Sequence, residues 1–189
     1  MLPIGWSIFS RLSGLRFGFD IILEGDFMID PALFDAVRGS ILLHGMDDAD
    51  LARLAVVCEE RHMAEGTTVF IENMPGESLF LIRKGAIRIS KMFAEGDEQQ
   101  LVILGPAELL GEMAVVDGLP RTATARVVEN AELISLKKKD FEALCQDYPS
   151  LALKLVMNIV RVFSRRVRDS HDEYRDMLIW STQSNSPAG

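Results

Sequence analysis

The stretch that decides the fold is residues 111–124, GEMAVVDGLPRTAT. Its two glycines bracket a run that predicts a short helical turn, and the first backbone N–H groups of such a turn form a small anion site. Arg121 follows the bend at Pro120, so its guanidinium can reach the same anion and donate two hydrogen bonds. The Glu112 carboxylate beside that site is suited to accept a sugar hydroxyl proton. The stretch therefore predicts a nucleotide site.

Short β-rich runs lie on both sides of this stretch. They are TTVFIE (67–72), SLFLIRK (78–84), AIRISKMF (86–93), QLVIL (100–104), TATARVV (122–128) and AELISL (131–136). Turn sequences separate them, and we expect Asn73, Gly76, Gly85, Gly96 and Gly105 to supply positive φ angles there. Strands this short and evenly spaced predict a small barrel or roll.

Three helices are expected to flank the roll. Residues 47–61 have apolar spacing typical of an amphipathic helix, with Asp47 or Asp48 as its cap. A short helix is predicted at 137–147, and a long one begins at Pro149. The long helix carries two apolar stripes, Leu153, Val156, Val160, Phe163, Val167, Ser170, Tyr174 and Leu151, Leu155, Ile159, Val162.

Two apolar stripes predict two buried faces on the long helix. One face can cover the roll and the other can pair with a second copy, which predicts a homodimer. The alternative is a single helix packed deeply in its own monomer.

The resulting fold class is mainly β with flanking helices: a double-stranded β-helix (jelly-roll) with an N-terminal helix and a long C-terminal helix. We expect residues 1–45 to be an N-terminal extension, partly disordered or helical. Residues 46–147 would form the roll, 148–178 a dimerisation or lid helix, and 179–189 a disordered tail.

Composition restricts the function. The 189 residues carry a net charge of −8 with a pI of about 4.9, which argues against a general nucleic-acid surface and predicts no direct DNA binding. Charges interrupt the apolar N-terminus, so no membrane span and no secretory leader are predicted, and the cytoplasm is the expected compartment. Scattered histidines and two distant cysteines predict no metal site. Without a nucleophile elbow, we also expect no catalysis.

At these residues the chain resembles a known family. The run 66–124 is similar to the cyclic nucleotide-binding domain of the catabolite activator protein, the regulatory subunits of cAMP-dependent kinase and the cyclic-nucleotide-gated channels. The family's phosphate cassette, F-G-E-[LM]-A-L followed by P-R-x-A-[ST], stands here as LGEMAVVDGLPRTAT. Leu110 replaces the usual aromatic residue and Ala107 a usual glycine. The resemblance extends from about residue 46 to 171.

The resemblance implies a role for each cassette residue. Arg121 would pair with the cyclic phosphate, helped by the backbone N–H groups of Ala114 and Thr122, and Glu112 would bind the ribose 2′-hydroxyl. The expected ligand is cAMP, with cGMP as the alternative. Bacterial cAMP receptors commonly have serine at the position of Thr122, and a hydroxyl at this position can serve either base. The implied nucleotide contacts are Gly111, Glu112, Met113, Ala114, Arg121, Thr122 and Ala123. Base or lid contacts would come from Arg165, Arg166 or Ser170.

The predicted function is that of a stand-alone sensor that acts in trans on an unidentified effector protein. About a dozen residues follow Leu178, which leaves no room for a helix-turn-helix. Two alternatives stay open. The module could be a dimeric scaffold with a vestigial pocket, and Glu112 could simply pair with Arg121.

Overall fold

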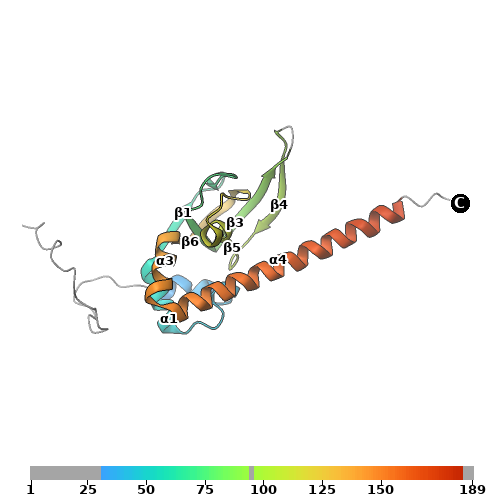
Figure 1. The fold of residues 1–189 in the computed structure, drawn as a ribbon. Helices are drawn as coiled ribbons and strands as arrows, with labels where there is room; N and C mark the ends of the chain where they lie inside the picture. The colour runs from blue at the N-terminus through green and yellow to red at the C-terminus, as the bar shows by residue number, and fades with distance from the viewer. Residues whose placement is uncertain (1–30, 94–95, 185–189) are drawn as a thin grey trace, which may run out of the picture.

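The computed structural model describes residues 31–93 and 96–184, in which helices flank an antiparallel sheet (Figure 1). The helices are η1 (Pro31–Val37), η2 (Ile41–Leu43), α1 (Asp48–Val57), α2 (Glu112–Asp117), α3 (Lys138–Asp147) and α4 (Pro149–Ser184). The strands are β1 (Cys58–Met63), β2 (Thr68–Phe70), β3 (Ser78–Met92), β4 (Glu98–Leu104), β5 (Leu109–Leu110) and β6 (Thr124–Lys137). The predicted fold class is confirmed.

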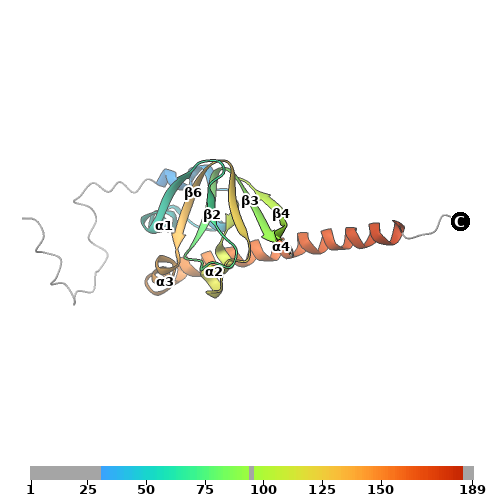
Figure 2. The ribbon, with the colours of Figure 1, turned by 90° about the horizontal axis from the view of Figure 1, so that it is seen from above.

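Strand β6 organises the sheet. It pairs with β1, β2 and β3, and β3 pairs in turn with β4 and β5, all antiparallel. Figure 2 shows the strands curving around an interior, with α2 on the side of the roll toward α4. The interior is filled by buried apolar side chains, Phe80, Ile82, Ile87, Leu104, Leu110, Ala125, Val127, Ala131 and Leu133.

Two strands are longer than predicted. β3 continues through Gly85 and β6 continues through residues 129–130, where the sequence predicted breaks. Gly85 has φ +84°, and a Cβ there would lie 2.4 Å from the Asn130 carbonyl oxygen. The two strands therefore bend together at this point. Asn73 and Gly96 also have positive φ as predicted, but Gly76 and Gly105 do not.

The helix predicted at 47–61 is wrong beyond Val57. Asp47 caps it as predicted, through a capping box with Asp50. Residues 58–63 form β1 instead, in register with β6 from Cys58 opposite Leu136. The charged run in β1 has good helix propensity, but its backbone hydrogen bonds are satisfied by β6, so tertiary pairing overrides the local preference.

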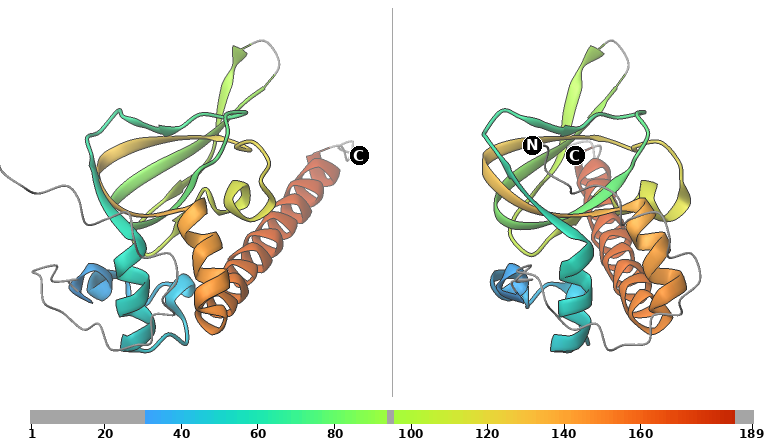
Figure 3. Two further views of the ribbon diagram at one scale, coloured as in Figure 1. Left: turned by 60° about the vertical axis from the view of Figure 1, so that its left-hand side comes forward. Right: turned by 90° about the vertical axis from the view of Figure 1, so that its left-hand side faces the viewer.

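α4 is anchored by its first half. Leu151, Leu155 and Ile159 are buried in a second apolar cluster with η1, α1, α3 and the sheet, as predicted for one stripe. The buried Asn158 side chain donates to the carbonyl oxygens of Leu42 at 2.8 Å and His44 at 2.9 Å, which ties α4 to η2. Figure 3 shows the first half of α4 running beside the other helices below the roll.

The rest of α4 projects away from the roll (Figure 1). The other stripe is largely exposed at Leu153, Val160, Val167 and Tyr174. The helix runs to Ser184, six residues past its predicted end at 178, so residues 179–184 are helical and not a disordered tail. Residues 185–189, like 1–30 of the predicted N-terminal extension, lie outside the described residues.

Candidate functional site

α2 is held between two glycines in the left-handed conformation, Gly111 at φ 75° and Gly118 at φ 71°. The predicted short helical turn is thereby confirmed. A Cβ on Gly111 would lie 2.5 Å from Nη1 of Arg121 and 3.2 Å from the Phe70 ring. Glycine is therefore required there twice, for the turn and for the close approach of the arginine.

Arg121 is a buried cation held by the roll. It is 5% exposed, and its Nη1 and Nη2 donate to the carbonyl oxygens of Gly111 and Ser78, each at 2.7 Å. The Phe70 ring lies under the guanidinium, 4.2 Å from ring centroid to Cζ. Its Nε is buried without a hydrogen-bond partner in the described part of the chain. Burial lowers the pKa of Arg121, but a guanidinium still keeps its charge.

Glu112 is a buried anion held by a different element. It is 1% exposed, and its Oε1 lies 2.6 Å from Nη1 of Arg166 on α4, whose Nη2 also donates to the Leu109 carbonyl oxygen. Oε2 of Glu112 is buried with no hydrogen-bond partner among the described residues. Burial raises the pKa of Glu112 above its ordinary value, and the positive charge of Arg166 opposes this rise.

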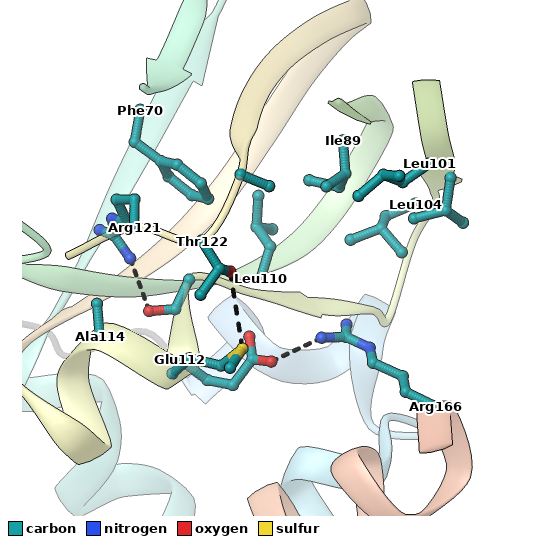
Figure 4. A pocket seen from close by; sticks show the side chains of 14 residues that line it. Phe70, Ile89, Leu101, Leu104, Leu110, Glu112, Ala114, Arg121, Thr122 and Arg166 are labelled. Atoms are coloured by element: carbon teal, nitrogen blue, oxygen red, sulfur yellow. Dashed lines mark hydrogen bonds and ion pairs between the residues drawn. The ribbon is translucent and has the colours of Figure 1, made fainter. Parts of the chain in front are cut away.

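The two buried charges do not pair with each other within 4.0 Å, so the alternative of a simple Glu112–Arg121 ion pair is not what the structure contains. They face a common cavity of about 200 Å³ (Figure 4). All seven predicted cassette residues line it, Gly111, Glu112, Met113, Ala114, Arg121, Thr122 and Ala123.

The three predicted lid residues lie in different places. Arg166 points into the cavity toward Glu112. Arg165, its neighbour on α4, lines a separate groove on another side of the helix. Ser170 is exposed, one turn farther along α4, and is not among the residues that line the cavity.

Sequence reasoning did not name the apolar wall of the cavity. Its members are Phe70, Ile89, Leu101, Val102, Leu104 and Leu110. The ladder between β3 and β4 pairs Ile89 with Val102 but Ser90 with Gln100, so Leu101 is an extra residue in β4. This bulge allows the adjacent Leu101 and Val102 both to line the cavity, although neighbours in a regular strand face opposite sides.

Gly76 supports the cavity from behind. A Cβ on Gly76 would lie 2.2 Å from the Ala114 Cβ and 3.1 Å from Cζ of Arg121. Because a 2.2 Å separation is far below van der Waals contact, any larger residue there would displace α2 or the arginine. Its role is close packing, since its φ is not positive.

Within residues 31–93 and 96–184, no group of three or more His, Cys, Asp and Glu side chains could hold a metal ion. Among the helices described, none combines the length and apolarity needed to cross a bilayer.

Comparison with known proteins agrees with this geometry. Residues 60–148 match the family model of the cyclic nucleotide-binding domain. The chain is 31% identical over 152 residues to the cyclic AMP receptor protein of Thermus thermophilus, covering 80% of this chain and 68% of that one. It is 27% identical to a CRP-like cAMP-activated global transcriptional regulator of Mycobacterium tuberculosis, covering 72% and 59%.

Solved structures give the same result. The catabolite activator protein of Thermus thermophilus superposes with a TM-score of 0.64 at 31% identity, covering 74% of this chain and 63% of that one. A cyclic nucleotide-binding domain from Methylobacillus flagellatus, at 22% identity and TM-score 0.70, shares the fold and covers 76% and 83%.

The chain thus spans about three fifths to two thirds of the regulators it resembles. The matched region runs from within β1 to the end of α3 and contains the cassette. The chain belongs to the cyclic nucleotide-binding domain family.

Proposed function

We propose that the protein binds a cyclic purine nucleotide, cAMP in preference to cGMP, and acts as a sensor on a partner protein. One observation carries the proposal: two buried side chains of opposite charge face one cavity, and each has a polar atom without a partner in the described residues. Unsatisfied buried polar atoms are costly, and a ligand with both an anion and a hydroxyl would satisfy them.

Arg121 would hold the cyclic phosphate. Two of its five N–H donors are used by backbone carbonyls, so donors remain for phosphate oxygens. The backbone N–H groups of Ala114 and Thr122 would complete the phosphate contacts.

Glu112 would accept the ribose 2′-hydroxyl through Oε2. Its other oxygen is already bound by Arg166, which fixes the orientation of the carboxylate and favours its ionised form. Arg166 therefore acts as a positioning residue, supplied by α4 when that helix lies against the pocket.

The base would lie along the apolar wall. The cavity is below the ~300 Å³ at which pockets for drug-sized ligands begin, so we expect it to enclose phosphate and ribose. Leu101 and Val102 are about half exposed at its edge and can cover one face of the purine. Similarity to a cAMP receptor and a cAMP-activated regulator supports cAMP, while the exposed hydroxyl of Thr122 can also serve guanine.

α4 would transmit the signal. A nucleotide that binds better when Arg166 contacts Glu112 shifts α4 toward that position, by no more than its difference in affinity for the two states. The exposed stripe Leu153, Val160 and Val167 supports a homodimer through α4. Hydrogen exchange along α4 would be unchanged by saturating nucleotide if this transmission were absent.

The test is isothermal titration of the full chain, unfolded and refolded to remove copurified ligand, with cAMP and cGMP in parallel. Saturable binding with a preference for cAMP is the expected result. A folded dimer that binds neither nucleotide would contradict the proposal and favour the scaffold function, for which the exposed stripe of α4 is the working surface.

A further inference from the structure

A second groove runs along another side of α4. Two cavities of about 350 and 320 Å³ lie between α4 and the segments 39–44 and 106–109. Both are lined by Ile41, Arg165 and Asp169, so they form one continuous groove. Arg166 lines both this groove and the nucleotide cavity, so the two sites meet at this side chain.

The groove is strongly cationic. Arg161, Arg165 and Arg168 follow one another at spacings of four and three residues, which places them on one side of the helix. Arg161 donates to the amide oxygen of Asn158, and neither Arg165 nor Arg168 has an ion pair within 4.0 Å in the ranges the structure covers. All three arginine side chains are exposed.

Few acids oppose this charge. Asp169 lies in the groove, and Glu108 lines one end but accepts the Gly105 backbone N–H at 2.7 Å. His44 and Arg166 are the other titratable groups that line it. In a chain with a net charge of −8, three neighbouring arginines with so few acids are a local reversal of sign.

We propose that this groove docks an acidic segment of a partner protein, with carboxylates on the three arginines and apolar side chains between them. The groove is lined by Ile41, Val162 and Leu109, which suit apolar side chains. A nucleic acid fits less well, because its phosphodiester backbone would leave these apolar side chains unused.

The groove is also compatible with the proposed dimer. The exposed stripe contains Val160 and Val167. Arg161 and Arg168 each lie one residue after a stripe position, and Arg165 lies two residues before Val167. At 100° per residue these arginines point away from a second α4 packed on the stripe. The docking site does not depend on the nucleotide proposal, since it uses no cassette residue.

The test is fluorescence anisotropy of the full chain with a fluorescein-labelled peptide of alternating glutamate and leucine. We expect saturable binding that weakens as salt is raised, because exposed charges are screened within about 10 Å at 0.1 M salt. The double variant Arg165→Glu/Arg168→Glu should bind about tenfold more weakly or worse, because two exposed ion pairs become repulsive.

The control is Lys84→Glu/Lys139→Glu, which makes the same change in net charge at exposed positions outside the groove. It should bind the peptide like the original chain, and circular dichroism should show both variants folded. The proposal is overturned if the peptide does not bind, if both double variants weaken it equally, or if oligo-dT binds more tightly than the peptide. Titration of the original chain with cAMP tests the nucleotide proposal separately.

Discussion

The two ends of the nucleotide cavity are built in different ways. At one end, Arg121 is held by carbonyl oxygens and an aromatic ring that all belong to the roll. At the other end, Glu112 depends on Arg166, which comes from α4, 54 residues later in the chain. The proposed phosphate end is therefore complete whenever the roll is folded, whereas the proposed ribose end is complete only when α4 lies against it.

In the proposed function, this difference would separate affinity from signalling. A buried cation whose hydrogen bonds all go to backbone carbonyls of the roll favours an anion that enters, whatever the position of α4. Burial raises the pKa of the Glu112 carboxylate, and Arg166 on α4 opposes this rise. The charge state of Glu112 therefore depends on the position of α4. Changes at the arginine end should therefore abolish binding, and changes at the glutamate end should modulate it.

The largest effect is expected at Arg121. Arg121→Ala removes charge-assisted bonds to the phosphate and should weaken nucleotide binding about 100- to 1000-fold, measured by isothermal titration. Arg38→Ala, at an exposed ion-paired arginine just after η1, is the control and should bind normally. If Arg121→Ala kept its affinity for the nucleotide, Arg121 would not be the phosphate-binding residue.

A smaller but still large effect is expected at Gly76. Gly76→Ala forces a methyl group against Ala114 and Arg121, and overpacking of about 1–3 kcal/mol corresponds to a loss of affinity on the order of tenfold. Gly39→Ala is the matched control, because a Cβ there meets nothing within 4 Å. Equal affinities in the two variants would mean that α2 moves freely, contrary to the rigid phosphate end.

The effect at Arg166 should be moderate. Arg166→Ala removes one ion pair to Glu112, and we expect nucleotide affinity to fall about fivefold, the equivalent of about 1 kcal/mol. The loss should grow as the pH is lowered, because Glu112 without the arginine is protonated more readily. Arg165→Ala is the neighbouring control. A pH-independent loss would indicate that Arg166 contacts the nucleotide and does not position Glu112.

The smallest effect concerns stability at Glu112. Because burial raises its pKa above the ordinary 4.5, the folded chain binds more protons than the unfolded chain between these values. This contribution to stability is complete below pH 4.5 and is lost as the pH rises through the raised pKa. Glu112→Gln removes this pH-dependent loss of stability. The free energy of unfolding of the variant in urea, minus that of the original chain, should therefore increase with pH over that window.

Glu142→Gln, at an exposed position on α3, should show no such trend. The same trend in both variants would mean that the raised pKa of Glu112 is not its cause.

The cassette could be predicted from sequence because its parts are local. Glu112 begins one short helix and Arg121, nine residues later, follows it, and the glycines that bracket the helix fix the geometry between them. The two stripes of α4 were likewise predictable from periodicity alone.

The contributions from distant parts of the chain were not predictable. Which of Arg165, Arg166 and Ser170 faces the cavity depends on the register of α4, which is set by packing and by Asn158 at its anchor to η2. The bulge at Leu101 depends on its pairing with β3. In both cases tertiary contacts decide which side a residue faces, and the local sequence carries no signal of them.

The buried Asn158 gives α4 the mechanics of a lever. If the helix tilts about this anchor, Arg166 lies about 12 Å from the fulcrum and Ser184 about 39 Å, at 1.5 Å per residue. A displacement of about 1 Å at the glutamate contact then becomes roughly 3 Å at the far end of the helix, by proportion along a rigid rod. Because α4 projects so far beyond this anchor, a movement smaller than a side chain at Glu112 becomes a movement at the far end that is large enough to make or break a packed interface.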